Sequence, residues 1–91
     1  PGVAAAKVAV IGGGVVGANA TRIAHGMRAQ VTVLDRAARV LSALDIEFGG
    51  AVETRFATRE AIEEAVADSD LVIGAVLVPG AAAPRLVTRA M

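Results

Sequence analysis

The chain has 91 residues, the size of one small domain or of part of one. Nine basic and nine acidic side chains cancel, and cysteine is absent, so nucleic-acid binding, a disulfide framework and a thiolate zinc site are not expected. Val8 to Thr21, one of the two longest uncharged runs, is interrupted by glycines and has no cationic flank, which argues against a signal peptide or membrane span. We therefore expect a cytoplasmic domain that binds neither nucleic acid nor membranes.

Short apolar segments rich in β-branched residues alternate with segments of helical periodicity. The apolar segments lack polar alternation, which is typical of strands covered on both faces. In chain order the sequence predicts a strand at 7–11, a helix at 14–27, a strand at 30–35, a helix at 37–47, a strand at 52–56, a helix at 59–68 and a strand at 70–77. Such alternation with short links favours a parallel sheet with right-handed crossovers.

Several residues support individual elements. The helix at 14–27 is indicated by apolar residues that recur at helical spacing, namely Val16, Ala20, Ile23 and Met27. Thr58 is a suitable N-cap for the helix at 59–68. Pro84 is a favourable first helical residue, so another helix is expected to begin near it. Because Met91 follows before any fifth strand, we expect the chain to be a piece of a larger protein.

A cluster of glycines follows the first predicted strand and opens the first predicted helix. Residues 12–17 match G-x-G-x-x-G in the strand–turn–helix context that dinucleotide binding requires. Gly12 permits the tight turn, Gly14 lets a pyrophosphate approach the backbone, and Gly17 lets the helix lie close to the strand. The helix N-terminus then offers N–H groups to the phosphates. The pattern predicts a dinucleotide site, with a glycine-rich turn that binds no ligand as the alternative.

An acidic residue ends the second predicted strand. Asp35 stands 18 residues after Gly17, where a carboxylate accepts hydrogen bonds from a ribose 2′-hydroxyl and disfavours a 2′-phosphate. Arg36 beside it could accommodate a 2′-phosphate, but with Asp35 present the pair favours NAD over NADP. Capping of the next helix is an alternative role for Asp35, and it is compatible with ribose binding.

The stretch AVLVPGAAAP at 75–84 follows the fourth predicted strand. In a sheet of order 3-2-1-4, ligands bind between the carboxyl ends of strands 1 and 4. Val76 and Leu77 would give the cofactor apolar contact there, although a simple turn after a buried strand is an equal alternative. No nucleophile–base pair and no metal-ligand grouping is apparent. The sequence thus predicts a partial Rossmann fold: an α/β domain with a four-stranded parallel sheet of order 3-2-1-4 and helices on both faces, ending before a fifth strand.

Beyond these patterns, the segments KVAVIGGGVVGANATRIA, VTVLDR and DLVIGAVLVPGAAAP resemble the NAD-binding domain of the alanine dehydrogenase family and, more loosely, the related proton-translocating transhydrogenases. The resemblance extends over nearly the whole chain. It implies reversible oxidative deamination of L-alanine to pyruvate and ammonia with NAD. The positions that it implies in cofactor binding are Gly12, Gly14, Val15, Val16, Gly17, Asp35, Ala57, Val76 and Leu77.

The chain departs from the family pattern at two positions. Arg28 stands where the family usually has a glycine, which raises the question of backbone strain, and Ala57 lacks a common hydroxyl. The resemblance also implies a separate substrate domain with the catalytic lysine and histidine, and a catalytic aspartate later in the nucleotide domain. Residues 1–91 would then be the N-terminal half of the NAD-binding domain of a homo-oligomeric enzyme, inactive alone and without catalytic or metal-binding residues. The alternatives are a regulatory nucleotide-sensing module and the nucleotide-binding part of a transhydrogenase.

Overall fold

The computed structural model describes residues 5–12, 14–74 and 85–88. The elements in them are β1 (Lys7–Ile11), α1 (Val15–Gly26), β2 (Gln30–Asp35), α2 (Ala38–Phe48), β3 (Glu53–Phe56), α3 (Arg59–Asp68), β4 (Leu71–Gly74) and β5 (Arg85–Thr88). The seven predicted elements are confirmed, with described ends that differ by at most one residue. β4 is described only as far as Gly74, because residues 75–77 of the predicted strand lie outside the described residues.

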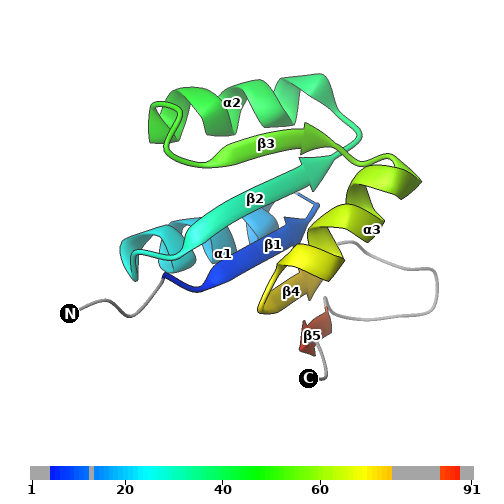
Figure 1. Ribbon diagram of the computed structural model, residues 1–91. Helices are drawn as coiled ribbons and strands as arrows, with labels where there is room; N and C mark the ends of the chain where they lie inside the picture. The colour runs from blue at the N-terminus through cyan, green and yellow to red at the C-terminus, as the bar shows by residue number, and fades with distance from the viewer. Residues whose placement is uncertain (1–4, 13, 75–84, 89–91) are drawn as a thin grey trace.

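The strands form one sheet in the order β3-β2-β1-β4-β5 (Figure 1). β1 pairs in parallel with β2 on one side and with β4 on the other, and β2 pairs in parallel with β3. The predicted order 3-2-1-4 is therefore confirmed. All four parallel strands end at the same edge of the sheet, and this edge carries the predicted site.

Residues 85–88 correct two expectations. Instead of a helix near Pro84, they form β5, which pairs antiparallel with β4 so that Arg85 lies opposite Gly74. The sheet thus has a fifth strand, and it does not end at the fourth. Val87 and Thr88 are β-branched and favour an extended backbone, and pairing satisfies the N–H and C=O groups along the outer edge of β4. A proline is as compatible with the start of an edge strand as with the start of a helix.

Two apolar layers enclose the sheet. α1 and α2 cover one face and α3 covers the other (Figure 1). Along β1, Val8 and Val10 face α1 and α2, whereas Ala9 faces α3, and β2 alternates in the same way between Val33 and Leu34. Both faces of the central strands are buried, which explains why their sequences are apolar without alternation.

The buried face of α1 consists of small residues. Gly17, Thr21 and Ala24 are buried, and the Thr21 hydroxyl donates a 2.7 Å hydrogen bond to the carbonyl of Gly17. Burial of Gly17 fits its predicted role in close packing of the helix on the sheet. The predicted helix is confirmed, but the larger apolar residues that indicated it lie mostly in solvent: Ile23 is 65% exposed and Met27 is 78% exposed.

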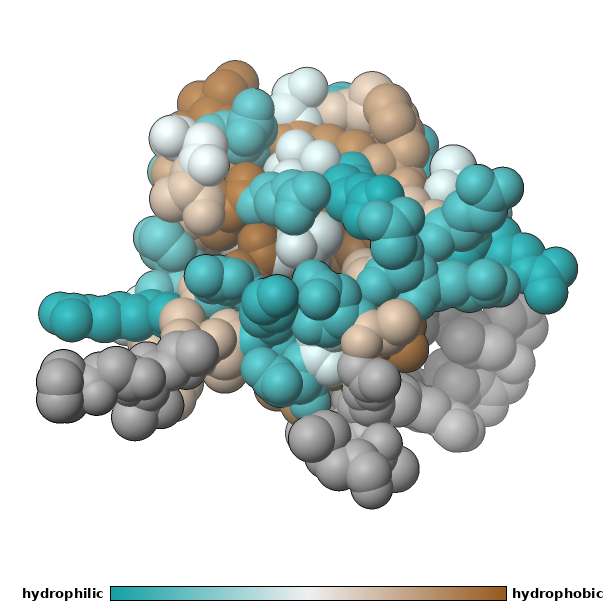
Figure 2. Space-filling view, viewed as in Figure 1, coloured by the Kyte–Doolittle hydropathy of each residue, from teal (hydrophilic) through white to brown (hydrophobic). Residues whose placement is uncertain are grey.

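α3 begins and packs as its sequence predicts. Thr58 is the N-cap, and its hydroxyl accepts a 3.1 Å hydrogen bond from the N–H of Ala61. Ala61 and Ala65 are buried against the sheet, and Arg59 and Glu63 form a 3.0 Å ion pair on the solvent side. Hydrophilic side chains accordingly gather over α3 in Figure 2. The outer face of α3 is a solvated surface.

The turn after α1 contains a strained residue. Arg28 has φ 66°, and among the described residues no other non-glycine residue has a positive φ. This conformation costs an L-residue about 1–2 kcal/mol, and replacement by glycine raises the entropy of the unfolded chain by a smaller amount. We therefore expect Arg28→Gly to raise the free energy of unfolding by about 0.5–1 kcal/mol in urea denaturation.

A neighbouring position provides the control for this prediction. Met27 is exposed and has φ −87°, so glycine relieves no strain there. Met27→Gly should lower the free energy of unfolding, because only the entropic cost of glycine remains. If both variants change stability in the same direction, strain at Arg28 is not the cause.

Candidate nucleotide-binding site

The glycine turn connects β1 to α1 at the carboxyl edge of the sheet. Gly12 has φ 98°, a conformation that glycine adopts without a Cβ penalty. Its N–H donates a 2.7 Å hydrogen bond to the carbonyl of Leu34 in β2. The turn is thereby held against the end of the neighbouring strand. Gly13 lies outside the described residues.

Gly14 is the N-cap of α1 and has room for a side chain. Its φ of −68° is available to any residue. A Cβ built on it would meet no atom of the described residues within 4 Å. Neither conformation nor packing in this part of the chain therefore requires glycine here. A side chain would instead occupy the space in front of the helix N-terminus, which is where a bound phosphate would lie.

Among the described residues, no side chain accepts a hydrogen bond from the N-terminus of α1. No side chain caps it, and its first turn contains no acidic residue, whereas α3 has both Thr58 and Glu60 in those roles. The N–H groups of Val15, Val16 and Gly17 precede the first carbonyl that an α-helical bond could reach. Val15 is 81% exposed and Val16 is 50% exposed. An anion at this end could accept hydrogen bonds from these N–H groups and interact favourably with the helix dipole.

Asp35 lies directly beside the glycine turn. It follows Leu34, the residue that accepts from Gly12, and it is half-buried at the end of β2. One carboxylate oxygen, Oδ1, accepts a 2.8 Å hydrogen bond from the N–H of Ala37. Ala37 is itself the N-cap residue of α2, so Asp35 does not occupy that position, and its carboxylate binds the backbone of the turn that leads into the helix. This arrangement fixes the carboxylate at the edge where an adenosine ribose is expected.

The remaining predicted residues are only partly brought together. Ala57 is half-buried after β3, and its N–H donates a 3.0 Å bond to the carbonyl of Asp35. Arg36 is exposed next to Asp35. Gly12, Asp35 and Ala57 thus lie at the carboxyl ends of three neighbouring strands. Val76 and Leu77 lie outside the described residues.

A groove of about 570 Å³ runs between α1 and α2 from Gly14. Arg39, in the first turn of α2, also lines it and is exposed. The sequence reasoning missed this cation. The available signal was its position four residues after Asp35, at the start of the helix predicted at 37–47.

Two charged side chains bridge the two helices along this groove. Arg22 donates hydrogen bonds of 2.5 Å from Nε and 2.9 Å from Nη2 to the two carboxylate oxygens of Glu47. These bonds lower the pKa of Glu47 below its ordinary value of 4.5. A carboxyl group with a lower pKa in the folded state stabilises the protein above its ordinary pKa, and this contribution is lost as the pH falls.

We expect Glu47→Gln to be slightly less stable than the wild type near neutral pH. The effect should be small, because both side chains are exposed and the pair is screened by solvent. The difference should disappear as the pH falls below 4.5. Urea denaturation of both proteins at several pH values measures it, and a difference that persists in acid would contradict the assignment.

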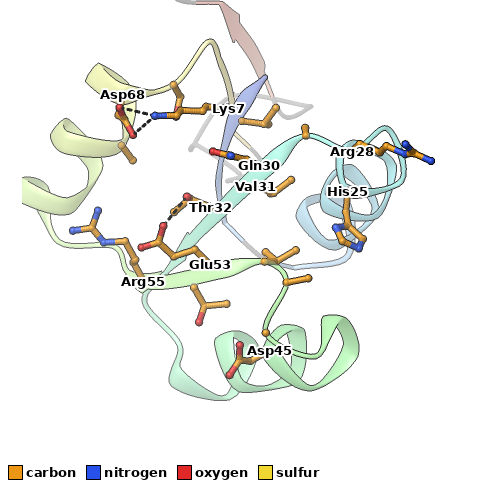
Figure 3. A pocket seen from close by; sticks show the side chains of 18 of the residues that line it. Lys7, His25, Arg28, Gln30, Val31, Thr32, Asp45, Glu53, Arg55 and Asp68 are labelled. Atoms are coloured by element: carbon orange, nitrogen blue, oxygen red, sulfur yellow. Dashed lines mark hydrogen bonds and ion pairs between the residues drawn. The ribbon is translucent and has the colours of Figure 1, made fainter. Parts of the chain in front are cut away.

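A larger hollow of about 1420 Å³ lies at the opposite edge of the sheet (Figure 3). It surrounds the amino ends of the strands, whereas open α/β sheets bind ligands at the carboxyl ends. Four of its charged side chains form ion pairs: Lys7 with Asp68 at 3.3 Å and Arg55 with Glu64 at 3.5 Å. Size alone therefore does not make it the candidate site.

Neither a metal site nor a membrane-spanning helix is found in residues 5–12, 14–74 and 85–88. These residues contain no group of three or more His, Cys, Asp or Glu side chains that could hold a metal ion. Within the same residues, no helix combines the length and the apolar character needed to cross a membrane.

Known proteins are similar to this chain in sequence and in fold. The chain is 62% identical over all its 91 residues to alanine dehydrogenase of Halomonas elongata and 55% identical to that of Mycobacterium tuberculosis, and it spans 24% of the length of each. A solved L-alanine dehydrogenase structure, 49% identical, superimposes with a TM-score of 0.78 over 82% of this chain and 21% of its own. The chain thus spans about a quarter of the length of these relatives. Residues 1–91 match the family described as alanine dehydrogenase/PNT, C-terminal domain, and the chain belongs to that family.

Proposed function

We propose that residues 1–91 are the N-terminal half of the NAD-binding domain of an alanine dehydrogenase. The whole enzyme would convert L-alanine, NAD and water to pyruvate, ammonia, NADH and a proton. This chain would bind the adenosine and pyrophosphate of NAD. The nicotinamide supplies the hydride chemistry, so we assign no catalytic residue to this segment. The proposal includes a separate substrate domain and a homo-oligomeric enzyme in the cytoplasm.

The observation that carries the proposal is the surplus space at Gly14. A glycine that neither conformation nor packing in the described chain requires stands in front of a helix N-terminus without a side-chain cap. A pyrophosphate fits both facts, because it needs the space and would accept hydrogen bonds from the N–H groups of the first helical turn. An unliganded glycine-rich turn explains neither.

The preference for NAD is based on Asp35. Its carboxylate would accept hydrogen bonds from the ribose hydroxyls and repel a 2′-phosphate. Arg36 and Arg39 add positive charge nearby, and both are exposed. We expect them to moderate the discrimination without reversing it. Val15, Val16 and Ala57 would lie beside the pyrophosphate and adenine, and Val76 and Leu77 would contact the cofactor from the loop after β4.

Two measurements test this function. The longer protein that carries this segment should reduce NAD when L-alanine is added, as followed by NADH absorbance. A regulatory sensor would bind NAD without alanine-dependent turnover. A transhydrogenase would exchange hydride between NAD and NADP without alanine. Titration with each nucleotide tests the cofactor separately, and equal or tighter binding of NADP would contradict the role of Asp35.

A further inference from the structure

We propose that one side of α1 and the adjoining face of β4 form an internal interface of the longer enzyme. The occupant would be an aliphatic, uncharged segment of the same polypeptide outside residues 1–91. This inference rests on the proposed function in one point only, namely that residues 1–91 belong to a longer polypeptide. The surface, here called the α1 flank, consists of Val16, Ala20, Ile23 and Met27 on α1 with Leu71 and Ile73 on β4.

The helical part of the α1 flank is apolar and exposed. Its residues recur at intervals of three and four, so they share one side of the helix. Val16, Ile23 and Met27 are 50%, 65% and 78% exposed, and no charged residue interrupts the row. A single exposed apolar side chain needs no explanation, but a continuous row of them in a soluble protein marks an interaction surface.

The contacts of α1 show where this row points. On the side toward α2, Arg22 binds Glu47, and the His25 ring meets Phe48 with centroids 5.2 Å apart. An α-helix turns by 100° per residue. Ile23 and Met27 therefore lie on one side of the buried face of α1, and Arg22 and His25 lie on the other side. The row therefore points away from α2. Because α2 lies over β2 and β3, the row points toward β4.

β4 presents apolar side chains to the same region. Leu71 and Ile73 pack against the core on the α1 side and are only partly buried, whereas Val72 is buried beneath α3 on the other side. Parallel strands of this kind are covered by helices on both faces. In the described part of the chain, α1 and α2 are the helices on this face, and neither covers β4 fully. A further element beside α1 would complete the layer.

The length of the relatives favours an occupant from the same polypeptide. Alanine dehydrogenases that match the whole chain are about four times as long, since it spans 24% of them. Most of such a protein therefore lies outside these residues and is available to cover the α1 flank. A covalently connected segment also avoids the loss of translational and rotational freedom that a separate partner incurs. A second copy of the protein is the alternative that the experiment must exclude.

Thiol labelling in the longer enzyme tests the interface. Residues 1–91 contain no cysteine, so Ile23→Cys and Met27→Cys each introduce one thiol into this segment, and mass spectrometry of its peptides reports the alkylation. Ile46→Cys is the matched control, because Ile46 is 82% exposed on α2 and lies outside the α1 flank. We expect alkylation at positions 23 and 27 to be at least about tenfold slower than at 46, at any protein concentration.

Two results would overturn the proposal. Equal rates at positions 23, 27 and 46 would show that nothing covers the α1 flank. Protection that disappears when the homo-oligomer is dissociated into folded single chains would assign the flank to a second copy. Neither readout depends on NAD or on alanine. A protected flank in an enzyme without alanine-dependent turnover would contradict only the proposed function, and an accessible flank in an active enzyme would contradict only the interface.

Discussion

A Gly14→Ala variant should bind NAD at least about tenfold more weakly than the wild type and retain its fold. A methyl group at this position would enter the space in front of the N-terminus of α1, where the pyrophosphate must approach the backbone. The protein itself accommodates it, since the φ of −68° suits alanine and no described atom lies within 4 Å. A tenfold loss corresponds to about 1.4 kcal/mol of binding free energy.

Calorimetric titration with NAD measures the effect, and circular dichroism with urea denaturation checks the fold. Alanine is a poorer N-cap than glycine, so a stability loss of up to about 1 kcal/mol is expected. Gly26→Ala is the matched control: a Cβ there also meets nothing within 4 Å, and the residue lies at the other end of α1. Unchanged NAD affinity in Gly14→Ala, or an equal loss in Gly26→Ala, would contradict a pyrophosphate at Gly14.

The sheet could be predicted from sequence because its order follows from local features. Alternating strands and helices require parallel pairing, and right-handed crossovers leave few arrangements. The same reasoning predicted that Gly12 and Asp35 would lie at one edge, since parallel strands end together, and the resemblance to the family added Ala57. The hydrogen bonds from Gly12 to Leu34 and from Ala57 to Asp35 confirm this juxtaposition. What these residues bind stays a prediction.

The buried side of α1 could not be read from hydrophobicity. A scale of side-chain hydropathy ranks Ile23 and Met27 far above Gly17 and Thr21, yet the small residues face the sheet. A helix can lie close to a sheet only where the side chains between them are small, and Gly17 permits the closest approach. Larger residues on the same helix must then project sideways. The apolar spacing therefore predicted the helix correctly but not which of its residues are buried.

The last strand depended on a contact distant in sequence. A short segment such as 85–88 has no decisive local preference, and pairing with the outer edge of β4 makes it a strand.

Arg28 shows the opposite situation, because its own position in the sequence indicated the conformation. Its departure from the family's glycine raised the question of strain, and its φ of 66° confirms a left-handed backbone. Arg39 was missed because no motif includes it.

Replacing Asp35 by asparagine should shift the nucleotide preference from NAD toward NADP. In the wild type, the N–H of Ala37 donates a 2.8 Å hydrogen bond to Asp35 Oδ1. Asparagine lacks the charge but keeps an oxygen that can accept this bond, so the turn into α2 should persist. Two like charges 4 Å apart repel by about 1 kcal/mol in water and by about 4 kcal/mol at an effective dielectric of 20. We therefore expect the affinity ratio of NADP to NAD to rise at least about fivefold.

The ratio is measured by titrating wild type and variant with both nucleotides at one salt concentration. Asp45→Asn is the control, because it removes the same charge from α2 beside the hollow at the opposite edge of the sheet (Figure 3) and should leave the ratio unchanged. Arg36→Ala in the Asp35→Asn background should reduce the gain if Arg36 contacts the 2′-phosphate. An unchanged ratio in Asp35→Asn with an intact fold would mean that this carboxylate only shapes the turn before α2, and the preference for NAD would then have to come from residues elsewhere.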